Sequence, residues 1–161
     1  MTEQLRRFVR VMGASIGSVL IAAAGYTAHA SAQTLSTATL TVRVTGTRNA
    51  TGKLAVALFR DASGFPDDAS RAVRAQEVDI DARRFSAEVV FRDVPEGSYA
   101  VAVRHDENMN GKLDRNFLGM PTEGYGASNN PEKKMRAPMF EEAKFRLGAS
   151  DQTLEIRVIY Y

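Results

Sequence analysis

Apolar and polar residues alternate along much of the chain beyond residue 37. In ATLTVRVTG (38–46), Leu40, Val42 and Val44 are separated by single polar residues, and GKLAVALFR (52–60) repeats the pattern. A period of two residues is typical of a β-strand with one buried face. We therefore predict two strands, and the turn-forming residues between them, GTRNATG (46–52), predict a hairpin.

Five later segments have the same period, and each is predicted to be a strand. The two central ones are joined by the short sequence PEG (95–97), and the last one ends the chain. The segments, with the residues predicted to face inward, are 74–80, which has the weakest pattern; 84–94, with Phe85, Ala87, Val89 and Phe91; 97–106, with Tyr99, Val101 and Val103; 143–149; and 152–161, with Leu154, Ile156, Val158 and Tyr160.

These short segments, and the lack of any run of ten residues with helical period, predict an all-β fold. Turn-forming residues separate most of the strands, which is typical of an antiparallel β-sandwich of about seven strands. One region breaks the pattern, because residues 106–139 are rich in Gly, Asn and Pro and are too long for an ordinary connection. Connections of this length are usually functional or disordered, and we look for binding residues there.

The N-terminal segment has a different pattern, typical of an export signal. Arg6, Arg7 and Arg10 precede an apolar stretch, residues 11–24, and small residues follow it up to Ala32. We predict that residues 1–32 are a signal peptide; the small residues allow cleavage after Ala30 or after Ala32, and we favour Ala32. The apolar stretch is short for a membrane-spanning helix, which needs roughly 20 residues, so no membrane span is expected after cleavage. The predicted location is the periplasm or the cell exterior.

Cleavage would leave residues 33–161, that is 161 minus 32 or 129 residues, as a single β-sandwich domain with a loop insertion at 106–139. It would also remove three arginines and one glutamate, so that 21 basic and 19 acidic residues become 18 of each. A balanced chain without a clustered basic face has no electrostatic basis for nucleic-acid binding. We therefore expect a small ligand or a cell-envelope protein as partner.

The chain has no cysteine, and of its two histidines His29 lies in the predicted signal peptide. A zinc site normally requires three or four His or Cys ligands, so none is expected. His105, next to Asp106, is the one place for acid–base chemistry, with Ser98 and Ser128 as nucleophiles by residue type. No G-x-S-x-G or H-E-x-x-H motif accompanies them, so we predict no catalytic residues. A hydrolase that uses His105 is the less favoured alternative.

The sequence DENMNGKLD (106–114) has the oxygen spacing of a calcium-binding loop, with Gly111 at the position of the sharp turn. Position 12 of such a loop is Phe117 instead of a bidentate glutamate, so calcium binding would be weak and would need outside donors such as Glu107 or Glu123. The alternative is a metal-free turn in which Asp and Asn bond to their own backbone. The predicted ligands are Asp106, Asn108, Asn110, the backbone carbonyl of Lys112, and Asp114.

Aromatic and amide side chains cluster in NFLGMPTEGYGASNNP (116–131). Tyr125, together with Asn129 and Asn130, would present an aromatic face beside hydrogen-bonding amides, which suits a sugar or a peptide. The alternative is that this segment folds back on the sandwich as a packed Ω-loop, without a ligand site.

The segment HDENMNGKLDRNFLGMPTEGYGASNN (105–130), with VPEGSYAVAVRHD before it and PMFEEAKFRL after it, resembles the small exported bacterial proteins of domain-of-unknown-function family 2141. The resemblance extends from about residue 39 to residue 160. It implies a transthyretin-like or carboxypeptidase-regulatory-like (Ig-like) β-sandwich, exported, with no established activity. Taken together, the sequence predicts an exported non-catalytic module that binds a ligand or a protein, with calcium as the candidate ion of its loop. A structural cell-envelope interaction domain is the alternative.

Overall fold

The computed structural model describes residues 36–134 and 136–161, and the predicted signal peptide, residues 1–32, lies outside them. The described residues are mostly β, as predicted, and none of their helices has the length and apolar character needed to span a membrane. Their strands are β1 (Thr37–Thr45), β2 (Lys53–Phe59), β3 (Arg74–Val78), β4 (Ala87–Pro95), β5 (Gly97–Asp106), β6 (Gly124–Ala127), β7 (Phe145–Leu147) and β8 (Gln152–Arg157); their helices are the 3₁₀ turn η1 (Ala69–Arg71) and the short α1 (Phe140–Ala143).

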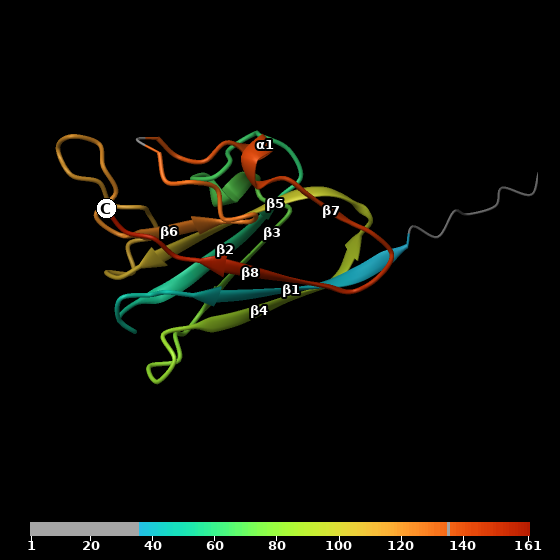
Figure 1. The fold of residues 1–161 in the computed structure, drawn as a ribbon, viewed down its shortest axis with the longest axis horizontal. Coiled ribbons are helices and arrows are strands. Elements are labelled where there is room, and N and C mark those ends of the chain that lie inside the picture. The colour runs from blue at the N-terminus through green and yellow to red at the C-terminus, as the bar shows by residue number, and fades with distance from the viewer. Residues whose placement is uncertain (1–35, 135) are drawn as a thin grey trace, which may run out of the picture. The chain divides into compact units, whose positions relative to one another are not determined.

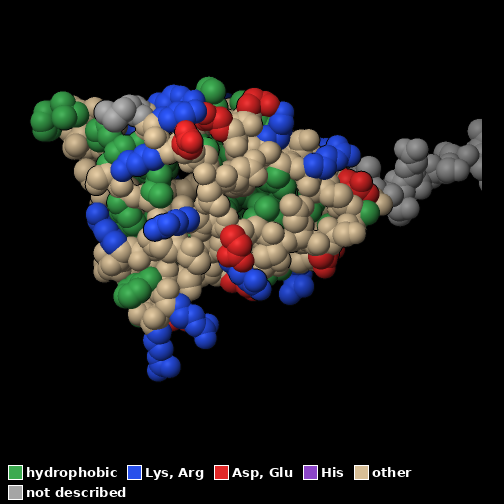
Figure 2. Space-filling view, in the orientation of Figure 1, with side chains coloured by type: hydrophobic (Ala, Val, Ile, Leu, Met, Phe, Trp, Pro, Cys, Tyr) green, Lys and Arg blue, Asp and Glu red, His purple; other side chains and the backbone are tan. Residues whose placement is uncertain are grey.

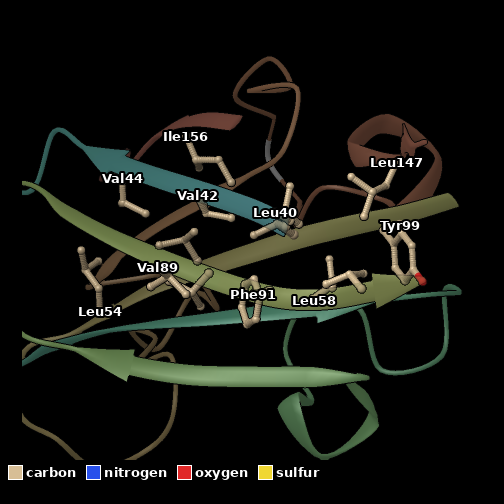
Figure 3. Close-up of a cluster of buried hydrophobic side chains, with 14 of the residues drawn as sticks. Leu40, Val42, Val44, Leu54, Leu58, Val89, Phe91, Tyr99, Leu147 and Ile156 are labelled. Carbon is tan, nitrogen blue, oxygen red and sulfur yellow. The ribbon is translucent and has the colours of Figure 1, made fainter. Parts of the chain in front are cut away.

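The strands form two sheets (Figure 1). One sheet has the order β4-β1-β8, and the other has the order β3-β2-β5-β6, with β7 also paired to β5. Figure 3 shows side chains from both sheets, among them Val42 of β1, Phe91 of β4 and Leu58 of β2, meeting in the space between the strands. Each of these three is at most 1% exposed. Full burial of one such side chain stabilises a fold by about 1.5–3 kcal/mol, so the alternating pattern provides the driving force for folding.

The pairing of the strands differs from the prediction. β1 and β2 do not form a hairpin, because β1 pairs with β4 and β8 whereas β2 pairs with β3 and β5. β4 and β5 also lie in different sheets, although only Glu96 separates them. The hydroxyl of Tyr99 donates a hydrogen bond of 2.8 Å to the carbonyl of Pro95 across this crossing. A turn-rich connection can cross between sheets as readily as it reverses within one, and a period of two does not distinguish these outcomes.

The prediction of a wholly antiparallel arrangement is wrong for one pair. β1 and β8 run parallel, from Leu40 opposite Gln152 to Thr45 opposite Arg157, whereas the other paired strands are antiparallel. β8 follows β7, which belongs to the other sheet, so the chain crosses over before it pairs with β1. Such a crossover leaves no mark on the apolar pattern.

The inward position predicted for Phe85 is also wrong. This residue precedes β4, has a φ of +50° and is 43% exposed. A bridge between Asp81 and Ser86 closes a turn there, so regular alternation begins only at Ala87. The predicted inward residues from Ala87 to Phe91 do belong to the core or pack against it.

The region 106–139 contains a strand that the sequence pattern did not predict. β6 pairs antiparallel with β5, and its two inward positions are Gly124 and Gly126. The C-terminal segment passes close beneath them, since a Cβ at Gly124 would lie 2.5 Å from Cγ1 of Val158. Because glycine supplies no apolar side chain, the period of two is absent from this strand.

Candidate functional site

The outward face of the five-stranded sheet is made of small residues where β2 and β5 pair. Ala57 lies opposite Ala102 in one row, and in the next row Ala55 lies opposite Arg104. Arg104 is in turn opposite Tyr125 of β6. Directly opposed residues share one face of a sheet, so the alanines leave space above the sheet, with Arg104 and Tyr125 beside it.

One end of this face is covered by a second hydrophobic cluster. The ring of Phe65 lies between those of Phe59 and Phe140, with centroid distances of 5.3 and 5.8 Å and nearly perpendicular planes. Phe140 belongs to α1, which lies over β5 in Figure 1. Edge-to-face packing of this kind stabilises the cluster, so α1 and the loop after β2 are fixed against the sheet.

Next to this cluster the face forms a groove with a cavity volume of about 70 Å³. Figure 2 shows apolar side chains grouped among Lys and Arg side chains on the side where β6 and α1 lie. The floor of the groove is formed by Ala55, Ala57 and Ala102, and its walls by Pro66 and Asp67, by residues between Leu113 and Pro121, by residues 136–138, and by Tyr125 and Tyr161.

Two stacked tyrosines form one wall of the groove. The rings of Tyr125 and Tyr161 have a centroid distance of 5.8 Å and an interplanar angle of 20°. The hydroxyl of Tyr125 donates to that of Tyr161 at 3.1 Å, and Nζ of Lys133 lies 3.9 Å from the centroid of the Tyr161 ring. Burial, together with this hydrogen bond, raises the pKa of Tyr125 well above its ordinary value, so the wall is uncharged at neutral pH.

Two of the arginines that line the groove are held by carboxylates. Arg115 donates to Asp67 at 3.1 Å and to the carbonyl of Gly119 at 3.2 Å. Arg136 makes a two-pronged contact with Glu142, at 2.8 and 2.7 Å. The Arg136 guanidinium holds the pKa of Glu142 well below its usual range, so this pair is ionised at neutral pH.

Arg104 differs from these two arginines. Its side chain is 16% exposed, and its Nε is buried without a hydrogen-bond partner among the described residues. The nearest carboxylate is that of Asp106, at 3.8 Å from Nη2, which is too long for a hydrogen bond. The guanidinium of Arg104 therefore keeps hydrogen-bonding capacity that its surroundings do not use.

The three residues predicted to bind a ligand have different surroundings. Tyr125 lines the groove, but the side chain of Asn129 donates to the carbonyl of Lys144 at 2.8 Å. The side chain of Asn130 donates to the carbonyl of Glu155 and accepts from the backbone N–H of Arg157, both at 2.8 Å. Both amides thus fix the backbone after β6. Asn130 also lines a second hollow with Tyr125, and ligand binding by the three residues stays a prediction.

The predicted calcium loop follows β5, as expected, and is closed by its own hydrogen bonds. Asp106 is 3% exposed, and its carboxylate accepts from the backbone N–H groups of Asn110 and Gly111, at 3.0 and 2.8 Å. The side-chain amides of Asn108 and Asn110 donate to Asp114 at 2.7 and 2.9 Å. A cation would have to displace these bonds, so the arrangement favours the metal-free turn.

The remaining predicted ligand, the carbonyl of Lys112, lies in the same turn, where the N–H of Lys112 donates to Oδ1 of Asn110 at 2.8 Å. Glu123, considered as an outside donor, is 4% exposed and accepts from the backbone N–H groups of Glu107 and Asp114, at 2.9 and 3.0 Å. Within residues 36–134 and 136–161 no three His, Cys, Asp or Glu side chains are grouped so as to hold a metal ion. Calcium binding by this loop stays a prediction.

His105 faces the interior and is fully buried. Its Nε2 lies 2.8 Å from the carbonyl oxygen of Thr51, and its Nδ1 lies 2.6 Å from the hydroxyl of Tyr160. A carbonyl can only accept, so Nε2 carries a proton, and in the neutral imidazole Nδ1 accepts from Tyr160. Neither nitrogen is available to a serine. Ser128 is engaged elsewhere, since its Oγ accepts from the N–H of Val101 at 2.9 Å, and Ser98 lies at the opposite end of β5.

The sequence contained a signal for the groove that the search for polar motifs missed. In LAVALF and YAVAVR four of the six outward positions are Ala, at residues 55, 57, 100 and 102, where a strand with a solvated outer face normally has polar residues. Small apolar residues on the second face indicate that this face is also covered.

A comparison with protein-family models matches residues 42–155 to the family described as "Uncharacterized protein conserved in bacteria (DUF2141)". Searches of curated proteins and of solved structures found no match.

Proposed function

The chain belongs to the bacterial DUF2141 family, and from that premise we propose that it is an exported, non-catalytic module that binds a small ligand in the groove over β2, β5 and β6. The observation that carries this proposal is the groove itself. Its floor is made of alanines on a face that would otherwise be polar, and ordered loops form its walls. Ligand sites in proteins are typically concave and mostly apolar, with a few polar groups that fix orientation. Arg104 and Tyr125 would be those polar groups.

The N-terminal sequence supports export. Basic residues, an apolar stretch and small residues follow one another in residues 1–32 as they do in a signal peptide, so we assign the mature protein to the periplasm or the exterior. The two sheets and their shared core support the finer fold assignment, a transthyretin-like or carboxypeptidase-regulatory-like (Ig-like) sandwich.

The environment of His105 supports a role without catalysis. A general base has to reach the proton that it removes, and both nitrogens of this buried imidazole are already bonded to Thr51 and Tyr160. A hydrolase that uses His105 is therefore the less favoured alternative.

The ligand site is tested by filling the groove. Ala55→Leu places a larger side chain on the floor, whereas Ala82→Leu places the same side chain in the exposed turn before β4, outside the groove lining. Binding of a polarity-sensitive fluorescent dye and a panel of small ligands in a thermal-shift assay would be compared for the two variants and the wild type. The proposal predicts that only Ala55→Leu weakens binding. Equal binding by both variants would contradict it.

A second candidate function is contact with a cell-envelope protein, and one specific feature favours it. The tip of the 113–121 loop exposes Phe117 and Leu118, which are 95% and 71% exposed. The tip is ordered, because Oδ1 of Asn116 accepts from the N–H groups of Leu118 and Met120 at 2.9 and 3.0 Å. An ordered apolar tip is typical of a contact surface. A pull-down from envelope extract with the wild type and with Phe117→Ser/Leu118→Ser tests this function, which requires that only the wild type retains a partner.

A further inference from the structure

The groove has a polarity that indicates the chemical class of its ligand. The side chains of its lining include Arg104, Arg115 and Arg136 but only one acidic side chain, that of Asp67. Asp67 is bonded to Arg115, and Glu142 beside the groove is bonded to both Arg136 and Lys134, so each of these two arginines has a hydrogen-bonded carboxylate. Arg104 is the arginine of the lining whose charge no hydrogen-bonded carboxylate balances.

The nearest carboxylate is already engaged elsewhere. Each oxygen of Asp106 accepts a backbone N–H of the following turn, and the distance to Nη2 of Arg104 is 3.8 Å. The buried Nε of Arg104 has no partner among the described residues. A small shift of the guanidinium toward the groove would lengthen the ion pair with Asp106 but break no hydrogen bond to it. It would also give the buried Nε a partner, and a buried donor is costly to leave without one.

We propose that the groove binds a small amphipathic carboxylate, with its apolar body over the alanine floor and its carboxylate on Arg104. This inference rests on the proposed function, because it names the ligand class of the same groove. The planar guanidinium matches a carboxylate in geometry as well as in charge. The floor contributes only methyl groups, at Ala55, Ala57 and Ala102, so it favours a hydrocarbon body over a sugar, whose hydroxyls need hydrogen-bond partners.

The position of Tyr125 fits the same ligand. Tyr125 lies opposite Arg104 on the neighbouring strand, and its hydroxyl is turned to Tyr161. Its ring therefore forms an apolar wall next to the guanidinium, and its hydroxyl does not compete with the ligand for the hydrogen bonds of Arg104. An apolar chain that packs on this ring brings its terminal carboxylate to Arg104.

The test compares octanoate with octanamide, which has the same chain but no charge, by isothermal titration calorimetry of the purified protein. Octanoate should bind more tightly by a factor on the order of ten to a hundred, the range expected for hydrogen bonds to a charged group. Arg104→Met should lower the affinity for octanoate to that for octanamide. Arg92→Met removes an exposed arginine of β4, outside the groove, and should leave both affinities unchanged.

The outcomes separate this inference from the proposed function. If octanamide binds as tightly as octanoate, or if Arg104→Met keeps the preference for octanoate, the carboxylate assignment is wrong while the groove remains a ligand site. If neither compound binds and Ala55→Leu does not alter dye binding, the proposed function itself fails. Should Arg104→Met not fold, Arg104→Lys replaces it, and the affinity ratio of the wild type still decides between the charged and the neutral ligand.

Discussion

The close approach of β6 to the C-terminal segment gives the sharpest test of the packing. A Cβ on Gly126 would lie 2.8 Å from the carbonyl oxygen of Arg157 and 3.0 Å from Cγ2 of Ile156. Favourable contacts between carbon atoms lie near 3.5–4.0 Å, so Gly126→Ala forces the backbone of β6 or of Arg157 to move. Gly126 does not have a positive φ, so its substitution carries only this steric cost.

Overpacking of this kind costs about 1–3 kcal/mol. Gly148 provides the matched control, since a Cβ there meets nothing within 4 Å. Like Gly126→Ala, Gly148→Ala reduces the conformational freedom of the unfolded chain, which by itself stabilises a protein by about 0.4–1 kcal/mol. Unlike Gly126→Ala, it introduces no steric clash. The difference between the two variants thus isolates the steric cost.

The assay is urea unfolding followed by circular dichroism, because the chain has no tryptophan to report on unfolding by fluorescence. The free energy of unfolding of Gly126→Ala should be lower than that of Gly148→Ala by about 1–3 kcal/mol, with equal m-values. Equal free energies would refute the close packing of β6 on the C-terminal segment. They would also remove the reason given for the glycines in this strand.

Three further predictions concern buried polar groups. His105→Leu leaves the carbonyl of Thr51 without its donor and the hydroxyl of Tyr160, which still accepts from the N–H of Arg48, without its acceptor. The substitution should lower the free energy of unfolding by about 2–4 kcal/mol in the same urea assay, and an unchanged value would contradict the bonding described for this imidazole. The Arg48 guanidinium holds the pKa of Glu107 below its ordinary value of 4.5, so the ion pair stabilises the fold fully above pH 4.5 and stabilises it less as the pH falls further. Between pH 7 and pH 3 the melting temperature of Glu107→Gln should therefore fall less than that of the wild type, and an equal fall in both proteins would refute the ion pair. Because the loop after β5 is closed by its own bonds, calcium should give no heat in a calorimetric titration and no rise in melting temperature, whereas Asp106→Ala should destabilise by about 1–3 kcal/mol; a rise with calcium that Asp106→Ala abolishes would establish the ion.

Much of the fold was predictable, because a single repeated signal encodes it. Wherever a strand buries one face in the core, as from Leu40 to Val44, alternation predicted the strand and the direction of its side chains. The pairing was not predictable, since the same alternation suits a hairpin and a crossing between sheets. β6 was missed because its inward residues, Gly124 and Gly126, are small so that another segment can pack closely on them.

The candidate site was predictable only in part. The polar motifs of the sequence indicated Asp106 and the asparagines after β6 as binding residues. In the structure the side chains of these residues hydrogen-bond to the backbone. The groove depends on an apolar signal, alanine at the outward positions of β2 and β5, and on Arg104 at the edge of that face. The residues that line the groove come from positions between 55 and 161, so folding brings together parts of the chain that are far apart in the sequence. No local sequence pattern indicates such a site.

The central claim is that a ligand binds on the alanine floor, and methyl NMR of the alanine-labelled protein tests it most directly. Titration with octanoate should shift the methyl signals of Ala55, Ala57 and Ala102, which line the groove. The methyls of Ala38 and Ala87, which lie in or against the core between the sheets, should not move. Unchanged floor signals at saturating octanoate, or shifts confined to Ala38 and Ala87, would contradict the account.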